Sequence, residues 1–113
     1  MSSQENRKSI IETNYTSALE SEPNDLAAAD TPEQVAAIQA NVANAKLVYY
    51  TAIASQLDGA GPEIEAAYQQ VQLALQAVKD AREAAGKIAD ILQKLTGATD
   101  AAKKLVDKIK TQT

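Results

Sequence analysis

The chain has 113 residues, a formal net charge of −4, no cysteine and no histidine. Its length suits a single domain, residues 1–113, and the lack of these two residue types excludes disulfides, thiolate metal sites and histidine-activated nucleophiles. Alanine is the commonest residue, with 23 copies, and only four glycines and three prolines interrupt the chain. This composition predicts an all-α protein with a thin core, since buried alanine removes little apolar area from water.

The N-terminal part predicts a first helix over residues 5–20. Its apolar residues Ile11, Tyr15 and Ala18 are spaced as one short helical stripe. We expect Pro23 to end this helix, because the residue before a proline is pushed away from helical backbone angles. Residues 21–31 would then form an acidic connector.

The tetrapeptide Thr31-Pro32-Glu33-Gln34 predicts the start of a second helix, residues 32–57. Thr31 can cap the helix, Pro32 suits its first position, and Gln34 can complete a capping box. One apolar stripe of this helix consists of Val35, Ile38, Val42, Ala45, Tyr49 and Ala52. A second consists of Ala36, Ala40, Ala43, Leu47, Tyr50, Ala54 and Leu57. Two stripes on one helix predict contacts with two neighbours.

The segment Asp58-Gly59-Ala60-Gly61-Pro62 is the clearest break in the chain, since glycines end helices and proline opens them. So short a link predicts that the second and third helices lie antiparallel as a hairpin. We expect the alanines within residues 67–85 to pack closely against those of the second helix.

A seven-residue apolar repeat continues from Ile64 to Ile109. One seam position holds Ile64, Val71, Val78, Ala85, Leu92, Thr99 and Val106. The other holds Ala67, Ala74, Ala81, Ile88, Leu95, Ala102 and Ile109. Because the repeat keeps its phase past Gly97, it favours a third helix over residues 62–95 that continues, straight or kinked, to about residue 110. A stop at Thr96–Asp100 is the alternative.

The expected fold is therefore an antiparallel helical hairpin with an added N-terminal helix. It resembles a coiled coil and is either closed as a three-helix bundle or completed in an oligomer. We expect no enzymatic activity, no cofactor and no metal site, because the acidic residues fall beside lysines at surface spacings such as Glu83–Lys87. The sequence pI of about 4.7 argues against nucleic acid.

The function favoured by this pattern is assembly through coiled-coil-type packing, with a second copy or another helical protein as the partner. The residues expected to carry it lie on apolar faces that such a hairpin leaves uncovered: Leu47, Tyr50, Leu57, Leu92, Leu95, Val106 and Ile109. Two alternatives stay open. One is an exported component or chaperone of a specialised secretion system, and the other is a lipid- or granule-surface binder using residues 99–110. The expected location is cytoplasmic, with signal-less export as the alternative.

Overall fold

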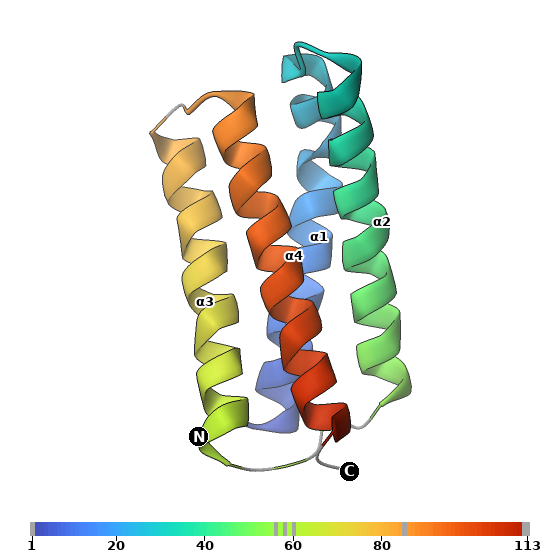
Figure 1. The fold of residues 1–113 in the computed structure, drawn as a ribbon, viewed down its shortest axis with the longest axis vertical. Helices are drawn as coiled ribbons and strands as arrows, with labels where there is room; N and C mark the ends of the chain where they lie inside the picture. The colour runs from blue at the N-terminus through green and yellow to red at the C-terminus, as the bar shows by residue number, and fades with distance from the viewer. Residues whose placement is uncertain (1, 56, 58, 60, 85, 112–113) are drawn as a thin grey trace.

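The computed structural model describes residues 2–55, 57, 59, 61–84 and 86–111. Within these residues the chain forms four helices and no strand: α1 (Gln4–Ala28), α2 (Pro32–Ala54), α3 (Pro62–Glu83) and α4 (Ile88–Thr111). Figure 1 shows α1 and α3 running in one direction and α2 and α4 in the other. The all-α prediction is confirmed, whereas the three-helix arrangement is wrong because the chain folds as a four-helix bundle.

Helix α4 lies at the centre of the packing. It contacts α1, α2 and α3, while the backbones of α2 and α3 do not approach each other closely anywhere along their lengths. These two helices therefore occupy opposite corners of the bundle. The predicted hairpin of the second and third helices is wrong for this reason. The alanines of α3 face the core around α4 instead of α2, with Ala67, Ala74 and Ala81 only partly buried there.

The long third helix of the prediction is broken between Glu83 and Ile88. The N–H of Gly86 donates to the carbonyl of Ala81 at 3.0 Å, and a Cβ on Gly86 would lie 3.1 Å from the same oxygen. Glycine therefore permits the close approach with which the chain turns back. The seam residues of α3 and α4 both face the core, so folding back covers a seam that a single rod would leave in water. Ala85 lies outside the described residues.

Helix α1 extends eight residues beyond its predicted end and contains Pro23 in its interior. Its last two turns are held from outside, since Asp25 is buried and paired with Arg82 of α3, and Leu26 packs against the core. These tertiary contacts offset the backbone hydrogen bond that a proline cannot donate. Most of the predicted acidic connector is therefore helix.

Helix α2 begins as predicted. The Thr31 hydroxyl accepts from the Gln34 N–H at 3.2 Å, while the Gln34 side chain accepts from the Asp30 N–H. The helix ends at Ala54, three residues before the predicted end. Of the predicted break before α3, Asp58 and Ala60 lie outside the described residues.

The connection from α2 to α3 contributes a core residue. Leu57 is fully buried in the left-handed backbone region at φ 51°, and its carbonyl accepts from Nη1 of Arg7 at 2.9 Å. The same Arg7 Nη1 donates to the carbonyl of Gly59, and Arg7 Nη2 lies 3.3 Å from Oε1 of Glu65. The buried Arg7 guanidinium thus links the start of α1 to the α2–α3 connection and to α3. These contacts hold the connection across the end of the bundle.

The predicted seam is confirmed along the whole of α4. Its buried members are Ile88, Leu92, Leu95, Thr99, Ala102, Val106 and Ile109. A third buried row, Ile91, Ala98 and Leu105, widens this face so that α4 can meet three neighbours. The helix is continuous through Gly97, as expected. None of the described helices combines the length and the apolar character needed to cross a membrane.

Candidate interaction surfaces

The outer face of α2 carries an exposed apolar stripe, which we call the outer seam. Its members, all exposed, are Ala36, Ala40, Ala43, Leu47, Tyr50 and Ala54. They recur at alternating steps of four and three residues, the spacing with which one helix packs on another. The inner stripe of the same helix contains the buried residues Ile38, Ala45 and Ala52. The two stripes predicted from the sequence are therefore real, but only one is covered.

The two largest members of the outer seam are strongly exposed, Leu47 by 66 % and Tyr50 by 53 %. The ring of Tyr50 lies 5.9 Å from that of Tyr49, and Nζ of Lys46 sits 5.6 Å from the Tyr50 ring centre. Tyr49 in turn stacks on Tyr15 of α1 at 5.6 Å and donates from its hydroxyl to Oε2 of Glu12. Tyr50 is thus held from two sides while much of its surface remains in water.

The hydrogen bond to Glu12, together with burial and the negative charge nearby, raises the pKa of Tyr49 above its ordinary value of 10.0. Tyr49 is therefore neutral near pH 7 and remains a hydrogen-bond donor. The hydrogen bond to Glu12 and the stacking on Tyr15 hold the Tyr49 ring beside Tyr50.

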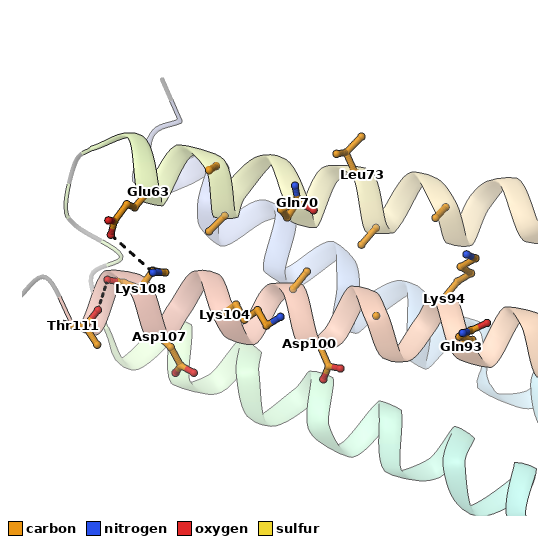
Figure 2. A pocket seen from close by; sticks show the side chains of 16 residues that line it. Glu63, Gln70, Leu73, Gln93, Lys94, Asp100, Lys104, Asp107, Lys108 and Thr111 are labelled. Carbon is orange, nitrogen blue, oxygen red and sulfur yellow. Dashed lines mark hydrogen bonds and ion pairs between the residues drawn. The ribbon is translucent and has the colours of Figure 1, made fainter.

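A groove of about 1030 Å³ lies between α3 and α4 (Figure 2). Small residues line both sides of it: Ala66, Ala67, Ala74, Ala77, Gly97 and Ala101. The charged residues along it are Glu63, Lys94, Asp100, Lys104, Asp107 and Lys108. Lys108 and Glu63 approach each other at one end, with Nζ and Oε2 3.9 Å apart. Three cations and three anions balance, so charge does not select a class of partner for this groove.

A second hollow, of about 570 Å³, lies between α1 and α3. These two helices pack against each other less than any other contacting pair in the bundle. Polar residues of α1, including Thr13 and Ser17, line one side, and the core residue Leu95 also contributes. The hollow therefore marks a region where α1 and α3 are loosely packed.

The seven residues predicted to bind a partner fall into two groups. Leu47 and Tyr50 lie on the outer seam. The prediction that the others lie on an uncovered face is wrong, because the four-helix bundle buries them in its own core: Leu57, Leu92, Leu95, Val106 and Ile109. For the four residues of α4 the reason is the missed turn, since folding α4 back onto α3 covers the half-seam that a single rod would expose. Leu57 is buried because the α2–α3 connection directs it into the core.

The small members of the outer seam were identified in the sequence as a stripe but not as a surface. Periodicity shows that Ala36, Ala40 and Ala43 share a face with Leu47, and it does not show whether a neighbour covers that face. Ile53 of α2 and Leu73 of α3, exposed by 48 % and 63 %, also belong to no predicted surface.

Comparison of the chain with protein-family models, with curated proteins and with solved structures finds no match. The fold and its surfaces therefore define a structural class: an antiparallel four-helix bundle in which the outer seam of α2 is uncovered.

Proposed function

We propose that this chain is a non-enzymatic helical interaction module, and that the outer seam of α2 is the face that packs against a helix of its partner. The observation that carries this proposal is the exposure of six apolar residues at coiled-coil spacing on a helix whose opposite face is already buried. Coiled-coil packing uses such a row as its seam.

The charge distribution of α2 supports this role. Between Pro32 and Ala54 the only charged residues are Glu33 and Lys46, although most residues on the outer side of this helix are exposed to water. Interfaces are depleted of charge at their centre and enriched in tyrosine. An ordinary solvent-facing helix carries many more charges than this one, since charged residues normally make up about a quarter to a third of a surface.

The surface-binding alternative lacks this kind of support. The apolar side of residues 99–110 is the one that faces the bundle core, with Leu105, Val106 and Ile109 buried. A lipid surface could reach these side chains only if α4 left the bundle, which would expose most of the core. The outer seam needs no such rearrangement.

Site-specific photocrosslinking in the cell of origin tests the proposal. Tyr50 is replaced by the photoreactive residue p-benzoylphenylalanine, and adducts are separated by mass. We expect discrete protein adducts, because the side chain at this position would be covered by a partner helix.

The matched control places the same photoreactive residue at Leu19, an apolar side chain of α1 that is 44 % exposed and lies outside the outer seam. Adducts from position 50 but not from position 19 support the proposal. Equal yields at the two positions, or none at either, overturn it.

A further inference from the structure

Building on the proposed function, we infer that the partner of the outer seam is a second copy of this chain, and that the two α2 helices pack antiparallel around a two-fold axis. Leu47 of each copy then faces Ala43 of the other. This arrangement follows from the order of large and small residues along the seam.

Reversing the seam on itself pairs every large side chain with a small one. With the axis between Ala43 and Leu47, Leu47 meets Ala43, Tyr50 meets Ala40, and Ala54 meets Ala36. Each layer occurs twice, giving six layers along the helix. Alternating large and small residues across facing positions is how helices interdigitate at close range.

The parallel alternative packs less evenly. It would set Leu47 on Leu47 and Tyr50 on Tyr50 at one end, with only alanines facing each other at the other end. The helices would be held apart by the large residues where the alanines need them close. The antiparallel pair keeps the spacing of the axes nearly constant.

The position of α2 leaves room for this contact. Helix α2 lies at a corner of the bundle, away from α3, and its outer seam is exposed. A helix of 23 residues is about 34 Å long, and two such faces would bury on the order of 1,000 Å², near the lower limit for a specific interface. The dimer is therefore expected to be weak and concentration-dependent.

The antiparallel orientation brings two like charges close together, and this contact can be tested. In the antiparallel pair Lys46 of one copy flanks the two-fold axis and comes near Lys46 of the other. Removing this charge, as in Lys46→Gln, should tighten the dimer, and added salt should do the same. Leu47→Lys should weaken it about tenfold or more, because it buries a charge in a layer built for an apolar side chain.

Disulfide trapping tests the arrangement directly, because the natural chain has no cysteine. Ala36→Cys and Ala54→Cys are made as separate single variants of the full chain. In the antiparallel dimer position 36 lies opposite position 54, while two copies of position 36 are about 27 Å apart. Oxidation of a mixture should therefore give the mixed disulfide dimer, and Ala36→Cys alone should give none.

Each other outcome overturns a stated part of the inference. Dimers from Ala36→Cys alone, without the mixed species, would show parallel pairing. No dimers in the mixture, with wild-type chain sedimenting at its monomer mass of 12.0 kDa over a tenfold concentration range, would exclude self-pairing. Leu19→Cys controls for random collision, and Leu19→Lys controls for charge in the sedimentation experiment.

Failure of self-pairing is distinguishable from failure of the proposed function. If photocrosslinking from position 50 gives an adduct with a different protein while the chain is monomeric, the interaction module stands and the second copy is wrong. A layer swap adds a positive test. Leu47→Ala should weaken dimerisation, and adding Ala43→Leu should restore it, since the large–small layer is rebuilt in reverse.

Discussion

Arg82, near the end of α3, forms a two-pronged ion pair with Asp25, near the end of α1. Its Nη1 and Nη2 lie 2.8 and 2.9 Å from Oδ1 and Oδ2 of the carboxylate. The Asp25 hydrogen bond raises the pKa of Arg82 against the opposing effect of burial, so the guanidinium keeps its charge. The ion pair bridges α1 and α3, the two contacting helices that pack least closely, at the far end from Arg7, and fixes the part of α1 that follows Pro23.

Loss of either partner should destabilise the fold, but unequally. Asp25 is almost fully buried, whereas the Arg82 side chain is 29 % exposed. Arg82→Met leaves a buried carboxylate without its cation and should lower the free energy of unfolding by about 2 kcal/mol. Asp25→Asn leaves a guanidinium that water can still reach and should cost about 1 kcal/mol. Urea unfolding of both variants measures the difference, and equal losses would contradict it.

Thr99 is the one polar residue in the α4 seam, and its hydroxyl accepts from Nδ2 of Asn14 at 3.2 Å. Both residues are buried. Thr99→Val should cost about 1–2 kcal/mol, because the Asn14 amide loses a partner where water hardly reaches it. Asn14→Leu combined with Thr99→Val should recover part of that loss. Thermal unfolding of the single and double variants tests this, and a double variant no more stable than Thr99→Val would count against it.

Two glycines should respond to alanine with opposite signs. Gly97 lies within α4, and a Cβ there meets nothing within 4 Å, so Gly97→Ala should stabilise the fold by about 0.5–1 kcal/mol. A Cβ on Gly86 would press on the Ala81 carbonyl at 3.1 Å. Gly86→Ala should therefore destabilise by about 1 kcal/mol, since backbone must move. Calorimetry of the two variants gives the signs, and a shift in the same direction for both would refute the assignment of the turn.

Glu65 should make stability depend on acid pH. Burial raises its pKa, but hydrogen bonds from the Ser2 N–H and hydroxyl and from Arg7 outweigh burial, so the pKa lies below the ordinary value of 4.5. The unfolded chain then takes up the proton first as the pH falls. Its contribution is complete above about pH 5 and is lost as the pH drops through 4.5 and the lower folded pKa.

The variant Glu65→Gln isolates this effect from the other carboxylates. Between about pH 5 and pH 3 the urea midpoint of the wild-type chain should fall more steeply than that of the variant. Parallel slopes over that window would show that Glu65 does not contribute.

Local signals predicted the parts of the fold that depend on nearby residues. Thr31 caps α2 as its hydroxyl and the following proline suggest, and Gly97 is tolerated because a glycine in an exposed helix costs only about 1 kcal/mol. The α4 seam was readable because seven-residue spacing places its members on one face whatever covers them. These features need no knowledge of distant residues.

The helix boundaries that failed depend on distant contacts. Pro23 does not end α1, because Asp25 and Leu26 beyond it are held by other helices. The turn at Gly86 does not disturb the heptad, so the repeat could not reveal it. Leu57 enters the core only because its left-handed backbone and the buried Arg7 direct the loop across the bundle.

The outer seam shows the same difference between what a local sequence pattern reveals and what depends on distant contacts. The stripe from Ala36 to Ala54 is visible as a pattern, but its exposure depends on which helices become neighbours. That order follows from the crossing of the α2–α3 connection, which depends on Arg7, 50 residues away from Leu57 along the chain.

The central place of α4 also bears on how the protein is made. This helix is synthesised last, so α3, with Ile64, Val71 and Val78, lacks its main packing partner until α4 has left the ribosome. Helices α1 and α2 can pair early, while α3 waits. A chain truncated before Ile88 should therefore expose these side chains and bind the dye ANS, whereas the full chain should not.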